Sequence, residues 1–270
     1  MNAICGTSTV PVGMDDTATF PPSGNEWPGL AHAAGQLGVA LDTDAAARFA
    51  LYRNLLLERS AQFNLTAIRD PDEVERRLFL DAIAMAPSLD RVIAADGHGH
   101  GSRVRLVDVG AGAGFPGLPL KIMRPTIDVT LIDATAKKVA FINEVIDQLG
   151  LDAARAVQGR AEDLGQETSY RTQFDVATAR AVAPLPVLLE YVIPFLQVGG
   201  TALLPKGLQI TEELRVGRRT AALLGSEIVS ASELPGETTR LVVVRKIAPT
   251  PAHYPRRTGI PSRDPLGERP

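Results

Sequence analysis

The sequence has little cysteine and no long apolar segment, and each shortage excludes a class of protein. Cys5 is the only cysteine, so an intrachain disulfide and a cysteine-based metal cluster are both impossible, as is usual in a reducing compartment. His98 and His100 lie in a glycine-rich stretch without a third ligand nearby, and we expect no metal site there. The longest apolar run, residues 181–196, is broken by three prolines and a glutamate and falls short of the roughly 20 residues that span a bilayer. With no signal-peptide pattern at the start, we expect a cytoplasmic protein that does not enter the membrane.

The net charge is also small, because 28 Lys and Arg are set against 31 Asp and Glu, which gives −3. The whole chain therefore shows no electrostatic sign of a polyanionic partner. The distribution is uneven, however. Residues 1–27 contain three acidic residues and no basic one, whereas residues 245–270 contain six basic and two acidic residues, a local charge of +4. We expect this basic tail to contact phosphates.

Composition divides the chain into segments of different character. The first is rich in Gly, Pro, Ser and Thr and has little to bury, so we expect it to be disordered. A helical pattern follows, with one helix predicted over residues 43–61 and another starting at Asp70, where Pro71 and Glu73 complete a capping box. The predicted segments are a disordered region 1–27, an N-terminal helical cap 28–95, a linker 96–102, a main domain 103–247 and a basic, Pro-rich tail 248–270.

Strand-like runs alternate with helical patterns through the main domain. This alternation predicts an α/β fold with a doubly wound, mainly parallel sheet of seven strands, of which the last two form an antiparallel pair. The predicted strands are 104–109, 129–132, 154–157, 174–177, 200–204, 227–230 and 241–246, and the clearest helices are 137–149 and 186–196.

The first predicted strand runs directly into a glycine-rich turn, the most informative segment of the chain. Gly110, Gly112, Gly114 and Gly117 permit a tight turn and close approach of a ligand to the backbone. The last three also fit the G-x-G-x-x-G pattern of a dinucleotide site, so the glycines alone leave an NAD-dependent oxidoreductase open. Asp108, at the end of the same strand, favours S-adenosylmethionine, because a buried carboxylate needs a cation or donors and would repel a pyrophosphate. Its alternative role, accepting amides of the turn, is compatible with either ligand.

Acidic residues also follow the next two strands. Asp133 is placed to accept both ribose hydroxyls of an adenosine cofactor, and its alternative role is to cap the helix that contains Lys137 and Lys138. Ala161 and Glu162 would lie beside the adenine, although Glu162 taken alone is more often a solvated loop acid. The carboxyl ends of neighbouring strands therefore predict one adenosine site.

The segment after the fourth strand narrows the reaction. It lacks the Asn- or Asp-Pro-Pro-aromatic turn that orients an exocyclic amine, and this absence argues against methylation of an amine. The only cysteine, Cys5, lies in the segment expected to be disordered, so a mechanism with a covalent thiolate adduct of a pyrimidine is excluded. A nucleophile with a free lone pair, such as N7 of guanine, needs alignment rather than deprotonation. Arg180 is predicted to orient the cofactor or the base and Lys206 to contact RNA, with ordinary surface cations as the alternative for both. Other substrates on the same fold, and a nucleotide-binding scaffold without catalysis, stay open.

Several motifs, in order, resemble those of the bacterial small-subunit ribosomal RNA guanine-N7 methyltransferases, also called the glucose-inhibited division protein B family. The likeness spans about residues 45–247, and the tail 254–266 looks like the basic ending of many members. The motifs are Asn64-Leu-Thr-Ala-Ile68 with Arg69-Asp-Pro71, Asp108-Val-Gly-Ala-Gly-Ala-Gly-Phe-Pro-Gly117, Leu131-Ile-Asp133 with Lys137-Lys138, Arg180-Ala-Val-Ala183 and Lys206-Gly207. The Phe-Pro-Gly ending is far more specific than the glycines alone.

The resemblance implies a class I methyltransferase that transfers a methyl group from S-adenosylmethionine to N7 of one guanine in 16S ribosomal RNA, free or in the 30S subunit. We expect a monomer. Cofactor contacts implied by the family are Gly110, Phe115, Asp133, Ala134, Thr135, Ala161, Glu162 and Arg180, to which the glycine turn adds Asp108, Gly112 and Gly114. Phosphate contacts are expected from the tail and from Arg53, Arg69, Arg76, Arg77 and Lys206.

The chain departs from the family pattern at four positions of the helical cap. Arg59 and Ser60 stand where members usually have Trp-Asn, and Leu78 and Ala82 stand where they usually have His and Ser. The departures leave the predicted cofactor residues intact and concern the placement of the substrate.

Overall fold

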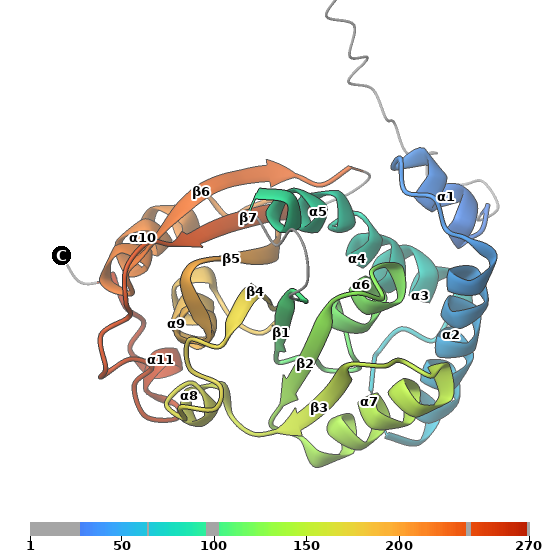
Figure 1. The fold of residues 1–270 in the computed structure, drawn as a ribbon, viewed down its shortest axis with the longest axis horizontal. Helices are drawn as coiled ribbons and strands as arrows, with labels where there is room; N and C mark the ends of the chain where they lie inside the picture. Colours follow the sequence, from blue (N-terminus) through green and yellow to red (C-terminus); the bar gives the residue numbers. More distant parts are fainter. Residues whose placement is uncertain (1–27, 64, 96–102, 236–238, 269–270) are drawn as a thin grey trace, which may run out of the picture.

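The computed structural model describes residues 28–63, 65–95, 103–235 and 239–268 (Figure 1). The expectations for the first 27 residues, for the linker with His98 and His100 and for Arg269 in the tail lie outside these residues. Within the described part of the chain, no helix is long and apolar enough to cross a membrane. No three His, Cys, Asp or Glu side chains of that part gather where they could hold a metal ion.

Seven strands form one sheet in the order β3-β2-β1-β4-β5-β7-β6. Neighbours from β3 to β5 are parallel, whereas β7 runs antiparallel to both β5 and β6. The prediction of a doubly wound sheet with a terminal antiparallel pair is confirmed. The strands are β1 Arg105–Val109, β2 Asp128–Asp133, β3 Ala154–Gln158, β4 Phe174–Thr178, β5 Leu196–Gly207, β6 Ser226–Glu233 and β7 Thr239–Lys246.

One predicted helix was too long. The helix expected over 186–196 is α9, Leu185–Val192, and it gives way to a 3-10 turn, Ile193–Phe195. Pro194 has no N–H with which to continue an α-helix, so the chain turns there and enters β5. The helix predicted over 137–149 is α7, Ala136–Leu149, and it ends at Gly150 in the left-handed conformation.

The N-terminal helices contain an irregular turn. Asp70 caps the start of α3 by accepting the backbone N–H of Glu73 at 2.9 Å, as predicted. The chain then forms a π-helical turn, Glu75–Leu80, whose extra residue per turn allows three successive apolar side chains to be buried. The elements are α1 Leu30–Gln36, α2 Thr43–Phe63, α3 Pro71–Val74, the π-helical turn, α4 Asp81–Ile83 and α5 Ala86–Ala95.

Helices cover both faces of the sheet (Figure 1). The N-terminal helices, α6 Gly117–Met123 and α7 pack on one face, where Tyr52 and Leu106 belong to one apolar cluster. A second cluster on the other face includes Ile132 and Leu189 and lies under α8 Ala161–Leu164, α9 and α10 Thr211–Leu223. The short α11, Ile260–Arg263, belongs to the C-terminal segment. The N-terminal helices therefore share a core with the sheet.

Candidate functional site

The glycine turn after β1 is held by two aspartates from neighbouring strands. Oδ2 of Asp108 accepts the N–H of Gly117 at 2.8 Å. Oδ2 of Asp133 accepts the N–H of Gly112 at 3.0 Å, and its Oδ1 accepts the N–H of Thr135 at 2.8 Å. Asp133 thus joins the turn to the start of α7. Each of its oxygens retains a second lone pair, so these bonds leave it able to accept ribose hydroxyls as well.

Asp108 has an unsatisfied oxygen. Its side chain is fully buried, and none of the described residues donates a hydrogen bond to Oδ1. Burial raises the pKa of Asp108 to about 7; the Gly117 amide and the charge of Arg180 lower the pKa, and the charge of Asp133 raises it. A buried carboxylate with a free oxygen fits a cationic ligand, because a positive charge nearby would stabilise the ionised form. The ammonium and sulfonium of S-adenosylmethionine meet this requirement, and a pyrophosphate does not.

A cavity of about 260 Å³ lies at the carboxyl ends of β1, β2 and β3. It brings together five residues that the sequence assigned to the cofactor site: Gly110, Asp133, Ala134, Ala161 and Glu162. Gly110 has φ of +72°, and a Cβ there would lie 2.7 Å from Cγ2 of Val182. Only glycine fits this approach. Parallel α/β sheets bind their ligands at this edge, so the cavity is the candidate cofactor site.

Other predicted cofactor residues lie around this cavity and do not line it. Gly112 and Thr135 support the turn through the amides that Asp133 accepts. The ring of Phe115 stacks on Tyr52 in the core, with 5.3 Å between ring centroids. Its side chain therefore fixes the turn to the N-terminal helices, and the cavity lining contains no part of it.

Arg180 links the end of β4 to the N-terminal helices. Its Nη2 donates to the carbonyl oxygen of Arg77 at 2.8 Å, and its Nη1 lies 3.5 Å from Oδ2 of Asp81. Burial lowers the pKa of Arg180, and the charges of Asp81 and Asp108 raise it. With a side chain only 19% exposed, Arg180 is not the ordinary surface cation that was its alternative interpretation.

Lys206 and several other predicted phosphate contacts have partners within the chain. Nζ of Lys206 donates to the carbonyl oxygen of Ala183 at 2.9 Å and lies 2.8 Å from Oε2 of Glu213. Lys206 therefore holds the segment that follows Arg180, and its RNA contact stays a prediction. Further ion pairs join Arg53 to Glu75, Arg76 and Arg77 to Glu73, and Arg256 of the tail to Glu190.

Tyr52 positions the glycine turn from α2, and removing its hydroxyl is expected to loosen the turn. The hydroxyl donates to the carbonyl oxygen of Ala113, and a Cβ on Gly114 would lie 2.6 Å from it. In Tyr52→Phe the ring stays but the buried carbonyl loses its donor, which costs about 1 to 2 kcal/mol. Chemical denaturation of the variant should show this loss of stability. A variant as stable as the wild type would contradict the positioning role.

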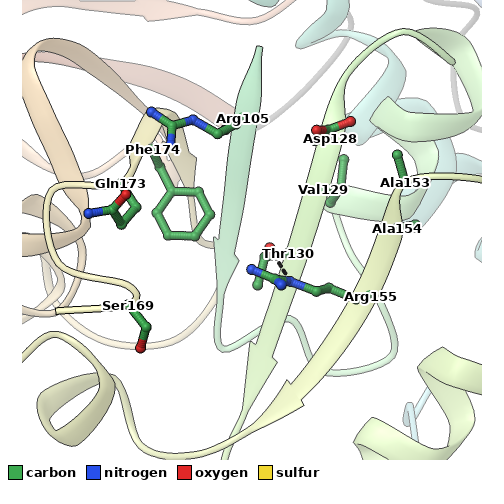
Figure 2. Close-up of a pocket in the computed structure, with 10 residues that line it drawn as sticks. All are labelled: Arg105, Asp128, Val129, Thr130, Ala153, Ala154, Arg155, Ser169, Gln173 and Phe174. Atoms are coloured by element: carbon green, nitrogen blue, oxygen red, sulfur yellow. Dashed lines mark hydrogen bonds between the residues drawn. The ribbon is translucent and has the colours of Figure 1, made fainter. Parts of the chain in front are cut away.

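A second cavity, of about 410 Å³, lies at the opposite edge of the sheet (Figure 2). It is lined by residues at the starts of β1 to β4, among them Arg105 and Phe174. Arg155 points into it and donates through Nε to the hydroxyl of Thr130 at 3.1 Å. The glycine turn and Asp133 are at the other edge, so the greater volume of this cavity does not mark the functional site.

Sequence reasoning missed seven residues that line the candidate cofactor site: Val109, Ile132, Gly159, Arg160, Val182, Tyr191 and Ser262. Val182 lies in the Arg180-Ala-Val-Ala183 motif, of which only Arg180 was predicted to act in the site. Tyr191 and Ser262 are far apart in the chain and have no local pattern that relates them, so no sequence signal pointed to either.

The strand order with an antiparallel β7, the glycine turn after β1 and the acid that ends β2 define a class I methyltransferase. The model of the family described as GidB, rRNA small subunit methyltransferase G, matches residues 45–242. The chain belongs to this family, and the resemblance inferred from the motifs is confirmed.

Three relatives, each named ribosomal RNA small subunit methyltransferase G, are similar over nearly their whole length. The protein of Chloroflexus aggregans is 44% identical over 85% of this chain and 93% of its own. That of Leuconostoc citreum is 43% identical over 87% of this chain and 96% of its own, and that of Roseiflexus castenholzii is 41% identical over 88% and 98%.

The four departures from the family pattern lie in packed parts of the helical region. Ser60 and Ala82 are fully buried, and Leu78 is 9% exposed. Arg59 forms an ion pair with Glu144 at 2.6 Å that joins α2 to α7. None of the four lines the candidate cofactor cavity. The four departures therefore change the packing of the N-terminal helices and leave the lining of this cavity unchanged.

Proposed function

We propose that this protein transfers a methyl group from S-adenosylmethionine to N7 of one guanine in 16S ribosomal RNA. The observation that carries the cofactor assignment is the buried Asp108 with its unsatisfied oxygen beneath the glycine turn. Family membership and the relatives' names support a small-subunit ribosomal RNA as the substrate. We also propose that the protein acts in the cytoplasm, where such a substrate is found. We also propose that it acts as a monomer.

The residues at the carboxyl edge would divide the cofactor among them. In the cavity lining, Asp133 would hold the ribose, and Ala161 with Glu162 the adenine. Asp108 is buried beneath the glycine turn and is not part of that lining, and its unsatisfied oxygen would hold the cationic methionine end. The bound cofactor supplies an electrophilic methyl group on a positively charged sulfur. N7 of guanine needs no base to remove a proton, so the chain's contribution is alignment. Arg180 supports that alignment by joining the β4 edge to the N-terminal helices.

Methyl transfer to ribosomal subunits tests the proposal. The protein would be incubated with methyl-labelled cofactor and 30S subunits from cells that lack this methylation, and the label would be located by cleavage at N7-methylguanine. We expect about one methyl group per 16S RNA, on guanine N7. Asp133→Ala serves as the control and should lose most of the transfer. Label in a small molecule, in a protein or on an exocyclic amine would contradict the proposal.

A further inference from the structure

The C-terminal segment supplies part of the cofactor cavity. Ser262, in the short α11, lines the same cavity as Gly110 and Asp133, although more than 100 residues separate it from them in the chain. Tyr191 of α9 lines it too and is 9% exposed, whereas Ser262 is exposed. The adenosine edge of the cavity is thus bounded by strand ends on one side and by α9 with the tail on the other.

The two hydroxyl groups form a hydrogen-bonded pair. Tyr191 Oη and Ser262 Oγ lie 2.8 Å apart, and either can be the donor. Burial raises the pKa of Tyr191, which keeps the phenol protonated at neutral pH. Two hydroxyls have two protons, and their mutual hydrogen bond uses one of them. The pair therefore retains one O–H to donate, and lone pairs to accept, on the surface of the candidate cofactor cavity.

The tail is anchored at Arg256, which precedes Ser262 in the chain. Arg256 donates to both carboxylate oxygens of Glu190, the neighbour of Tyr191, at 2.7 to 2.9 Å. The Glu190 side chain is fully buried, so this pair is held in a low-dielectric setting where a broken contact would be costly. Arg256 therefore anchors the tail, and its contact with a phosphate stays a prediction.

Glu162 connects the tail to the adenine end of the cavity. Its Oε1 accepts the N–H of Gly259 at 2.9 Å, and the side chain is buried at 6% exposure. Among the described residues nothing donates to its Oε2. One carboxylate thus holds the turn that leads into α11 and keeps an oxygen for a ligand. Arg171 secures the earlier part of the segment by donating to the carbonyl oxygens of Thr250 and Tyr254.

We infer that Tyr191 and Ser262 bind the adenosine half of the cofactor, so that the C-terminal segment is a cofactor-binding element. This inference rests on the proposed function. The pair would donate its remaining proton to an acceptor of the adenosine and would close the outer side of the cavity. A basic tail that serves only RNA has no need to line the cofactor cavity.

Calorimetry of S-adenosylmethionine binding to the full chain tests the inference. Ser262→Ala and Tyr191→Phe should each raise Kd about 3- to 10-fold, which corresponds to the loss of one neutral hydrogen bond. Ser262→Thr keeps a hydroxyl and should bind within about twofold of the wild type. The matched controls are Thr258→Ala, whose hydroxyl bonds Asp163 outside the cavity, and Tyr170→Phe, a tyrosine outside the lining. Neither control should change Kd.

Steady-state kinetics separates this role from a structural one. In Ser262→Ala the KM for cofactor should rise, while kcat and the KM for 30S subunits stay unchanged. An unchanged cofactor Kd in both Ser262→Ala and Tyr191→Phe, with the wild type still binding, would overturn the inference and leave the proposed function intact. A raised KM for 30S subunits with unchanged cofactor Kd would assign the pair to RNA and overturn it as well. A wild type that fails to bind the cofactor would instead refute the proposed function.

Discussion

Asp108→Asn should abolish tight cofactor binding and make the cofactor-free protein more stable at pH 8. The buried carboxylate is the proposed partner of a positive charge, and removal of one member of a buried ion pair typically weakens binding by about 100-fold or more. Without the ligand, the same carboxylate is costly because it is ionised at pH 8 without a donor on Oδ1. Asparagine removes that charge, and we expect the free energy of unfolding to rise by about 2 kcal/mol.

The raised pKa of Asp108 determines how stability and cofactor affinity change with pH. The pKa of Asp108 is about 7 in the folded chain, above its ordinary value of 3.8. Between pH 3.8 and pH 7, the folded state therefore keeps a proton that the unfolded state has released. The stability that this proton provides is lost as the pH rises through 7. The stability advantage of Asp108→Asn should disappear near pH 5. Cofactor affinity of the wild type should fall about tenfold per pH unit below 7 as Asp108 becomes protonated, and that of the variant should not.

Asp175→Asn is the matched control. Asp175 is also buried, but it lies near the start of β4, where it accepts the N–H of Arg105 and a side-chain N–H of Gln197. Its replacement should lower stability and leave cofactor affinity unchanged. Denaturation and calorimetry at pH 5 and pH 8 measure both quantities. An Asp108→Asn protein that binds the cofactor like the wild type would contradict the assignment.

Arg180→Met should reduce methyl transfer by about 100-fold, the order of loss expected when reacting groups move by about 1 Å. The guanidinium joins the β4 edge to the N-terminal helices through the carbonyl oxygens of Arg77 and Leu78 and through Asp81. Methionine fills similar space without these bonds. Asp81→Asn removes only the charge partner and should cost less than tenfold. Initial rates at saturating cofactor measure the effect.

Arg180 also affects Asp108, which provides a second readout. The charge of Arg180 lowers the pKa of Asp108. In Arg180→Met that pKa should therefore rise, and the midpoint of the pH dependence of cofactor binding should move to higher pH. A purely structural role for Arg180 would leave the midpoint in place. Full activity in Arg180→Met would show that alignment does not depend on this link.

The strands and the cofactor edge were predictable because both depend on local residue types. Buried parallel strands are short apolar runs, and the glycine turn follows the first of them with Asp108 at its end. The C-terminal limit of the 186–196 helix was predicted wrongly, since the effect of Pro194 was underestimated against an apolar pattern that suits a helix. The π-helical turn was not predicted either, because its burial pattern is one residue out of phase with an ordinary helix.

The partners of long side chains were beyond sequence reasoning. Arg256 was expected to contact phosphates because its segment is basic. In the structure it pairs with Glu190, which lies 66 residues earlier in an apolar helix. A buried carboxylate in such a helix signals that a cation covers it, but the sequence does not say which one. The position of Ser262 in the cofactor cavity was not predictable for the same reason. It follows the anchor of the tail, the long-range pair of Arg256 and Glu190.

The central claim is that the edge beside Asp108 and Asp133 is built for a positively charged sulfur compound. Calorimetry of the wild-type chain with S-adenosylmethionine and, separately, with NADH at pH 8 tests it most directly. Saturable binding of S-adenosylmethionine with no binding of NADH is the predicted result. Tight binding of NADH with none of S-adenosylmethionine would contradict it.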